Sequence, residues 1–189
     1  MPHRILLVYG TSYGQTQKIA ERMSQYLAER DCVVTLVRGD RLHPDFSLTG
    51  YDGIIVGASI VVSKHQRYIQ RFVRDHVATL NAVPSAFFSV SGSAGSRLDK
   101  ERVAARRLLN TFLTATGWKP RMTATIAGAI AFTKYNIVLR WFMKRISAKE
   151  GGSIDTSRDH EYTDWAQVLR FVEEFSAIVS ARRPRLAPA

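Results

Sequence analysis

The chain has 189 residues, 46% of them hydrophobic and 23% charged, which fits one domain with ample material for a single core. Its one cysteine, Cys32, excludes an intrachain disulfide and cannot form a zinc site by itself. The formal net charge of +11 favours polyanionic partners such as nucleic acid, anionic lipid or anionic substrates, although a basic surface can also serve solubility alone.

The first predicted elements are a buried strand, a loop and a helix. Residues 5–9 form a short apolar run, and apolar residues recur at helical spacing from 15 to 30. The loop between them consists of Thr11, Ser12, Tyr13, Gly14, Gln15 and Thr16. Its amides and hydroxyls meet the positive end of the helix dipole, which suits a phosphate, although an ordinary N-cap and turn would use similar residues. The Walker lysine and the three-glycine dinucleotide fingerprint are both missing.

The remaining elements continue an alternation of strands and helices. Strands are predicted at 33–37, 53–60, 86–90 and 123–130, and helices at 65–80, 99–116 and 164–180. This alternation predicts an α/β fold with a doubly wound, five-stranded parallel sheet, and the spacing suits the strand order 2-1-3-4-5. Ligands of such sheets bind outside the carboxyl ends of the strands, where the strand order reverses.

Two further loops at these carboxyl ends have the same composition as the first. The third strand ends in Ala58, Ser59 and Ile60. The fourth strand ends in Ser89, Val90, Ser91, Gly92, Ser93, Ala94 and Gly95. The loops lack the carboxylate pairs of a hydrolase and the His–Cys spacing of a metal site, so we expect no metal. A neutral cradle of this kind is suited to bind a cofactor that brings its own chemistry.

A long segment, about 131–162, separates the fifth strand from the last helix. We expect an amphipathic helix in it, with an apolar stripe at Tyr135, Val138, Leu139, Phe142 and Ile146. The remaining arc carries Lys134, Arg140, Trp141, Lys144 and Arg145. This helix either docks on the domain with its basic arc in solvent or lies in a membrane interface against anionic lipid. We expect residues 1–181 to form one domain that includes this insert, and residues 182–189 to form a basic tail.

With these motifs in place, the chain resembles the flavodoxin-like, quinone-dependent protoporphyrinogen dehydrogenases over nearly its whole length. The matching stretches are Gly14-Gln15-Thr16, Val56-Gly57-Ala58-Ser59-Ile60, Pro84-Ser85-Ala86-Phe87-Phe88-Ser89-Val90, Ile126-Ala127-Gly128-Ala129, Gly151-Gly152 with Asp155-Thr156, and Tyr162-Thr163-Asp164-Trp165. The first loop is common to flavodoxins, whereas the long basic insert followed by Gly-Gly and Tyr-Thr-Asp-Trp is more specific to this group.

The resemblance implies a flavodoxin-like fold and an FMN enzyme that oxidises protoporphyrinogen IX to protoporphyrin IX and passes the electrons to a membrane quinone. By position, residues 11–16 would hold the FMN phosphate. Residues 58–60 and 89–94 would flank the isoalloxazine ring, and the insert would form part of the substrate and membrane face. The resemblance identifies no catalytic side chain in this chain.

The chain departs from the family after the third strand. The family tends to have a basic and an aromatic residue where this chain has Val61-Val62-Ser63, and the loop after the fourth strand is shorter and richer in serine here. Both departures fall near the expected substrate pocket and leave the identity of the reductant open. Candidates to bind the two propionates of the substrate are Lys64, His65, Arg67, Arg97 and Lys134, although each alone also fits a solvated surface charge.

Two other functions stay open at this point. A flavodoxin-like electron carrier or NAD(P)H:quinone reductase would use the same fold with a different reductant. A basic adaptor for nucleic acid or phosphoprotein would bind no flavin, and the spread of Lys and Arg without an interleaved aromatic platform leads us to expect no nucleic acid partner.

The predicted location is cytoplasmic and peripheral on the inner face of the cell membrane. No apolar run approaches the roughly 20 residues of a membrane-spanning helix, and the first strand begins too early to leave room for a signal peptide. The expected partners are protoporphyrinogen IX, a membrane quinone and an anionic membrane surface, and the sequence leaves open whether the chain forms a homo-oligomer.

Overall fold

The computed structural model describes residues 2–43, 45–130, 133, 155–157 and 159–182. Its centre is a parallel sheet in the order β2-β1-β3-β5-β6. These strands are β1 (His3–Gly10), β2 (Cys32–Arg38), β3 (Gly53–Val61), β5 (Ser85–Ser91) and β6 (Met122–Ala127). Counting only these five strands along the chain, the order is 2-1-3-4-5, so the predicted doubly wound topology is confirmed.

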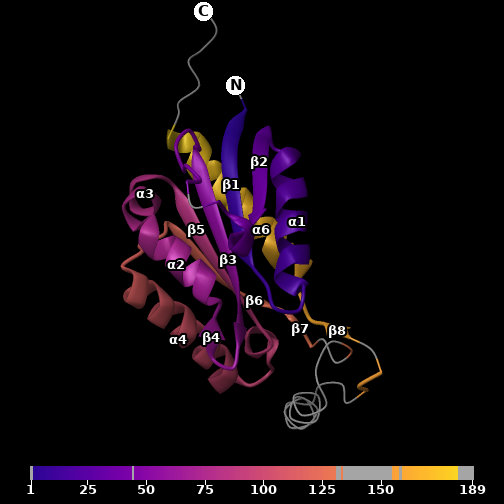
Figure 1. Ribbon diagram of the computed structural model, residues 1–189. Helices are drawn as coiled ribbons and strands as arrows, with labels where there is room; N and C mark the ends of the chain where they lie inside the picture. Colours follow the sequence, from indigo (N-terminus) through magenta and orange to yellow (C-terminus); the bar gives the residue numbers. More distant parts are fainter. Residues whose placement is uncertain (1, 44, 131–132, 134–154, 158, 183–189) are drawn as a thin grey trace, which may run out of the picture.

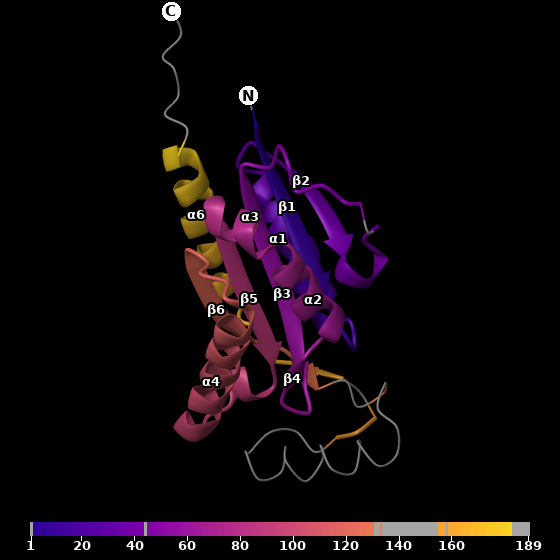
Figure 2. The ribbon, with the colours of Figure 1, turned by 60° about the vertical axis from the view of Figure 1, so that its left-hand side comes forward.

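Helices cover both faces of the sheet (Figures 1 and 2). One face carries α1 (Gln15–Ala28) and α6 (Trp165–Arg182), and the other carries α2 (Arg67–Asp75), α3 (Val77–Ala82) and α4 (Asp99–Thr116). Ile5 and Leu7 of β1 pack on the α1–α6 side, while Leu6 and Val8 pack on the α2–α4 side. Because both faces are buried, the central strands are continuous apolar runs rather than alternating ones.

One glycine in β3 sets the packing near the carboxyl end of the sheet. A Cβ atom on Gly57 would lie 2.0 Å from the ring of Phe88 on the neighbouring strand β5. Any side chain at this position would displace that buried ring. Gly57 therefore lets β3 and β5 approach with a large aromatic residue between them and α6, where Phe88 meets Phe171 edge to face.

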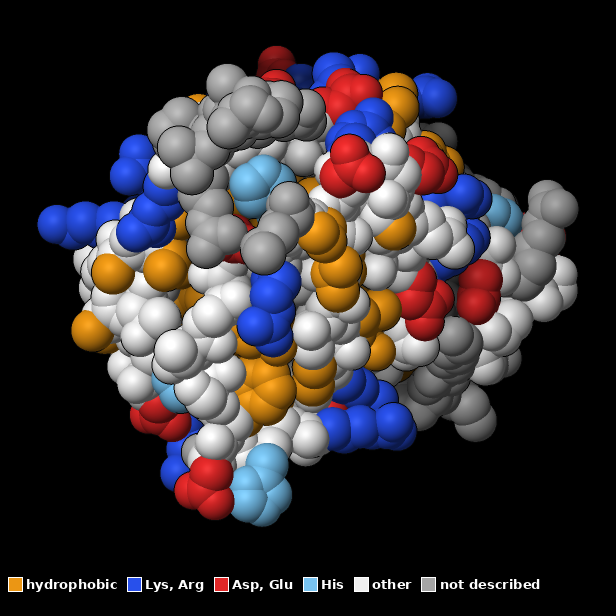
Figure 3. Space-filling model, turned by 90° about the horizontal axis from the view of Figure 1, so that it is seen from above, with side chains coloured by type: hydrophobic (Ala, Val, Ile, Leu, Met, Phe, Trp, Pro, Cys, Tyr) orange, Lys and Arg blue, Asp and Glu red, His pale blue; other side chains and the backbone are white. Residues whose placement is uncertain are grey.

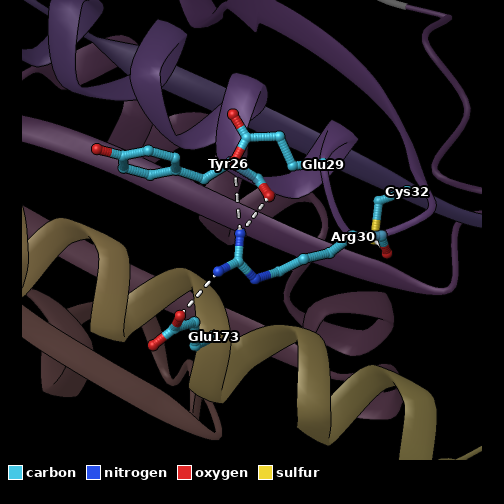
Figure 4. A network of polar contacts seen from close by, with 5 residues as sticks. All are labelled: Tyr26, Glu29, Arg30, Cys32 and Glu173. Carbon is cyan, nitrogen blue, oxygen red and sulfur yellow. Dashed lines mark hydrogen bonds and ion pairs between the residues drawn. The ribbon is translucent and has the colours of Figure 1, made fainter.

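An ion pair links the turn after α1 to α6 (Figure 4). The Arg30 guanidinium donates to the carbonyl of Tyr26 at 2.9 Å and to the carboxylate of Glu173 at 2.7 Å. Both side chains are partly exposed, so the ion pair contributes at most about 1 kcal/mol. Cys32 lies buried beside this contact, and burial raises the pKa of its thiol, as expected for an unreactive structural cysteine.

Two predicted elements differ clearly from the structure. The helix predicted at 65–80 is two helices that meet at His76, and His65 belongs to a short strand, β4 (Lys64–His65), that pairs antiparallel with the end of β3. The strand predicted at 123–130 ends at Ala127, and β7 (Ala129–Ile130) then pairs with β8 (His160–Glu161). Two 3-10 turns complete the elements, η1 (Gly39–Arg41) and η2 (Ser93–Gly95).

The amphipathic helix expected between residues 135 and 146 and the basic tail after residue 182 lie outside the described residues. Among the helices that the structure describes, none combines the length and the apolarity needed to cross a bilayer. The division into one domain with an insert and a tail stays a prediction.

Candidate functional site

The loops after β1, β3 and β5 lie at one edge of the sheet, which we call the rim (Figures 1 and 2). One amide side chain joins the first two loops. The Nε2 group of Gln66 donates to the hydroxyls of Ser12 and Ser59, and its Oε1 atom accepts the backbone N–H of Ser59 at 3.1 Å. The phosphate loop predicted from the sequence and the end of β3 are therefore held together by a residue at the start of α2.

The first loop turns sharply into α1 at Gly14. Its φ of 100° lies in the left-handed region, which glycine adopts without strain, and its N–H donates to Thr11 Oγ1 at 2.9 Å. The helix then begins without a side-chain cap. Within the described part of the chain, the backbone N–H groups of Gln15 and Thr16, the first two of α1, have no hydrogen-bond acceptor. These N–H groups are left to bind an anion at the positive end of the helix.

The hydroxyls of this loop can also donate to an anion. Thr16 Oγ1 is fully buried and has no hydrogen-bond partner among the described residues, an uncommon state for a buried polar atom. The hydroxyl oxygens of Thr11 and Ser12 already accept hydrogen bonds, so each keeps its proton to donate. This donor set fits a phosphate group, because it offers several neutral donors and no competing carboxylate.

The other predicted site residues divide into accessible and buried ones. Ser59 and Ile60 are half-buried at the end of β3, and Gly92, Ser93 and Ala94 are accessible in the loop after β5. The remaining predicted residues are buried within the sheet: Ala58, Ser89, Val90 and Ser91. The Ser91 hydroxyl accepts the N–H of Ala94 at 3.2 Å and so shapes the third loop from inside. A ligand at the rim would meet the first group directly and the second only through the backbone.

Besides Gln66, two further residues of the rim were not predicted as site residues. Thr163 donates to the carbonyl of Ala127 at 2.7 Å and accepts from the side chain of Gln15 at 2.9 Å, so it joins the end of β6 to the start of α1. The hydroxyl of Tyr68 accepts the N–H of Thr11 at 3.2 Å. Thr163 belongs to the Tyr-Thr-Asp-Trp motif that supported the family resemblance, but the motif did not indicate where in the fold this residue lies. Nothing in the sequence indicated Tyr68.

His65 is half-buried beside the end of β3, where its ring is engaged by neighbouring side chains, so its binding of a propionate stays a prediction. Its ring packs against Phe112 at 4.9 Å and Phe87 at 5.6 Å, and its Nε2 atom lies 2.8 Å from the buried hydroxyl of Ser89. Burial lowers the pKa of His65 to about 4, so the ring is neutral near pH 7. A neutral imidazole could meet a carboxylate only through its N–H group and not through charge.

The other candidate cations differ in position. Lys64, Arg67 and Arg97 are exposed near the rim, while Lys134 lies outside the described residues. Within the ranges that the structure describes, no three His, Cys, Asp or Glu side chains gather in a way that could hold a metal ion. The arrangement at the rim is one of hydroxyls, amides and glycine backbone, with basic side chains around it.

The family model described as a flavodoxin domain matches residues 6–157. A protoporphyrinogen IX dehydrogenase [quinone] of Leishmania major is 32% identical over 182 residues, which cover 96% of this chain and 78% of the relative. A protein of the same name from Escherichia coli (strain K12) is 32% identical over 174 residues, covering 92% of this chain and 94% of the relative.

Solved structures show the same fold at low sequence identity. Oxidised flavodoxin 1 from Bacillus cereus is 17% identical with a TM-score of 0.57, and the match covers 92% of this chain and 97% of that one. Rubredoxin oxygen:oxidoreductase from Desulfovibrio gigas is 14% identical with a TM-score of 0.59, covering 99% of this chain and 38% of that one. At these identities the likeness concerns the fold alone.

Proposed function

Because the chain belongs to the flavodoxin-domain family and, within it, to the quinone-dependent protoporphyrinogen IX dehydrogenases, we propose that it is an FMN enzyme that oxidises protoporphyrinogen IX and delivers the electrons to a membrane quinone. The observation that carries the cofactor part is the buried hydroxyl of Thr16, which has no partner among the described residues and lies beside the uncapped start of α1. The substrate part rests on 32% identity to the named relatives over nearly the whole chain.

In this proposal the first loop holds FMN by its phosphate. The amides of Gln15 and Thr16 and the hydroxyls of Thr11, Ser12 and Thr16 donate to the phosphate oxygens, and the helix dipole adds a favourable field. No formal positive charge is required, because hydrogen bonds to an ionised phosphate are themselves strong. The network of Gln66 holds Ser12 in place relative to β3.

The isoalloxazine ring would then lie along the rim. Ser59 and Ile60 on one side and residues 92–94 on the other would border it, mainly through backbone groups and small side chains. Bound FMN supplies a two-electron acceptor that can be reoxidised by a quinone, and the role of the chain is to orient substrate and cofactor. The exposed Lys64, Arg67 and Arg97 provide positive charge for the propionates of the substrate.

The proposal includes a peripheral position on the inner face of the cell membrane. The quinone is dissolved in the bilayer, and the net charge of +11 favours an anionic lipid surface. A protein that carries electrons between a polar pocket and a lipid-soluble acceptor has to approach that surface.

Anaerobic reduction of the FMN-loaded protein tests the reaction. We expect protoporphyrinogen IX to abolish the absorbance of oxidised flavin and a quinone to restore it, whereas NAD(P)H should reduce the flavin slowly or not at all. Rapid reduction by NAD(P)H, with none by protoporphyrinogen IX, would instead identify an NAD(P)H:quinone reductase or an electron carrier of the same fold.

A further inference from the structure

One aromatic hydroxyl reaches the phosphate loop from a helix on the other face of the sheet. Tyr68 is the second residue of α2, and α2 packs on the face opposite to α1. Its hydroxyl oxygen accepts the backbone N–H of Thr11 at 3.2 Å. The first residue of the proposed phosphate loop is therefore bonded to α2 as well as leading into α1.

The ring of Tyr68 is held in place by its neighbours. It is half-buried against the hydrophobic cluster on the α2–α4 side. A Cβ atom on Gly39 would lie 3.2 Å from Cδ2 of Tyr68, so the backbone of η1 packs closely against the ring. A side chain fixed in this way presents its hydroxyl to a ligand with little further loss of conformational entropy.

Among the described residues, both groups that meet this hydroxyl oxygen are donors. One is the N–H of Thr11, and the other is the guanidinium of Arg38 at the end of β2. Arg38 is fixed in turn by Asp40, whose carboxylate oxygen lies 2.9 Å from the Nε atom. A backbone N–H and a guanidinium have no acceptor to offer, so neither can take the phenolic proton.

The phenolic proton of Tyr68 therefore has no acceptor in the part of the chain that the structure describes. A hydroxyl that accepts hydrogen bonds, one of them from a cation, is also a better donor, because neighbouring hydrogen bonds polarise one another. An anion held beside Thr11 would be the matching acceptor. The loop that contains Thr11 is the one whose free amides and hydroxyls suit a phosphate.

Resting on the proposed function, we propose that Tyr68 is a further ligand of the FMN phosphate and donates its phenolic proton to a phosphate oxygen near Thr11. Arg38 is a positioning residue, because it acts on the phosphate through Tyr68. Helices from both faces of the sheet then hold the same group. This role accounts for the hydroxyl of Tyr68, since phenylalanine would pack against Gly39 equally well.

Tyr68→Phe tests this contact, because it removes the hydroxyl and keeps the ring. We expect the Kd for FMN to rise about tenfold, while the Kd for riboflavin, which has no phosphate, stays within about twofold of the wild type. Tyr51→Phe is the matched control, since its ring lies 5.3 Å from the guanidinium of Arg4 near the start of β1, and both affinities should be unchanged. In Arg38→Gln the Kd for FMN should rise by a smaller factor, about threefold, again with riboflavin unaffected.

A double substitution separates direct contact from an effect passed through Thr11. If Tyr68 and the Thr11 hydroxyl each donate to the phosphate, the losses of FMN affinity in Thr11→Val and Tyr68→Phe should multiply in the double variant. If Tyr68 serves only to hold Thr11, adding Tyr68→Phe to Thr11→Val should change the Kd no further. Thermal unfolding of each apoprotein shows whether the variant is folded, and Arg38→Gln carries the test if Tyr68→Phe is not.

Three results overturn the proposal. These are an unchanged Kd for FMN in Tyr68→Phe, an equal loss of affinity for FMN and riboflavin, and no further loss in the double variant. A wild-type protein that binds FMN no more tightly than riboflavin refutes the proposed function itself, and this is seen before any variant is compared.

Discussion

At the level of single residues, the proposal that the chain binds FMN depends on Thr16. Its buried hydroxyl has no partner among the described residues, and a phosphate oxygen would supply one. Replacing Thr16 with valine keeps the shape and removes the hydroxyl. We expect the apoprotein to be as stable as the wild type or slightly more so, and the Kd for FMN to rise about 10- to 100-fold, because a hydrogen bond to a charged group contributes about 1.5–3 kcal/mol.

Thr116→Val is the control for this substitution. The Thr116 hydroxyl is also buried, but it donates within α4 to the carbonyl of Phe112 at 2.9 Å and lies 3.2 Å from that of Leu113. Its removal should cost about 1 kcal/mol of unfolding free energy and leave FMN affinity unchanged. Normal FMN binding by Thr16→Val in titration calorimetry would show that this hydroxyl does not meet the phosphate.

His65 gives the fold a pH dependence with a definite sign. Its pKa is about 4 when folded, against an ordinary value of 6.5, because burial disfavours the charged ring. The unfolded chain therefore takes up the proton first, and the unfolding free energy falls as the pH drops from about 6.5 to about 4. The full loss is at most about 3 kcal/mol.

The variant His65→Gln isolates this contribution, since other groups titrate in the same range. Urea unfolding at several pH values should show a shallower decline for His65→Gln than for the wild type. Parallel profiles for the wild type and His65→Gln would mean that the imidazole is not enclosed as described.

At the level of elements, the five main strands were predictable because each is a short apolar run bounded by loop residues. The helix predicted at 65–80 was too long because Ile69, Phe72 and Leu80 keep an apolar spacing across the break at His76. The strand β4 has only two residues, too few for any periodicity. After β6 the chain turns at Gly128 into β7, whose pairing with β8 joins residues about 30 positions apart, a contact that no local pattern encodes.

The loops of the candidate site were predictable from the sequence, but the residues that connect them were not. The loop compositions placed the donors at one rim, since the carboxyl ends of parallel strands share an edge. The residues that connect these loops, Gln66 and Thr163, act through side-chain contacts 54 and 148 positions away in sequence. Their roles depend on the folded arrangement, and composition gives no sign of them.

Gln66 allows a test of this connection between elements. In Gln66→Met the links from α2 to Ser12 and Ser59 are lost, and the N–H of Ser59 loses its acceptor. We expect FMN affinity to fall about tenfold as the two loops lose their fixed distance, with the core and the thermal transition little changed. Gln70→Met, one turn further along α2, should bind FMN like the wild type, and equal affinities of all three proteins would argue against a bridging role.

At the level of the whole molecule, the chain carries a formal net charge of +11. The end of the molecule opposite to the rim shows basic side chains interspersed with acidic ones (Figure 3). Composition predicted the sign of the charge, but it could not predict this distribution, because a count of residues carries no positions.

A charged surface of this kind predicts salt-sensitive binding to anionic lipid. In flotation assays we expect the protein to bind vesicles that contain phosphatidylglycerol and to leave them as the ionic strength rises to about 0.5 M, where screening extends to only a few ångströms. Vesicles of phosphatidylcholine alone serve as the control. Equal binding to both lipids, or binding that salt does not weaken, would contradict an electrostatic attachment.

The claim on which the account depends is that the rim holds FMN by its phosphate through neutral donors. Equilibrium titration of the apoprotein with FMN and with riboflavin tests it, because the two ligands differ only in that phosphate. Several hydrogen bonds to an ionised group predict that FMN binds at least about 100-fold more tightly. Equal affinity for the two ligands, or binding of neither, would contradict the account.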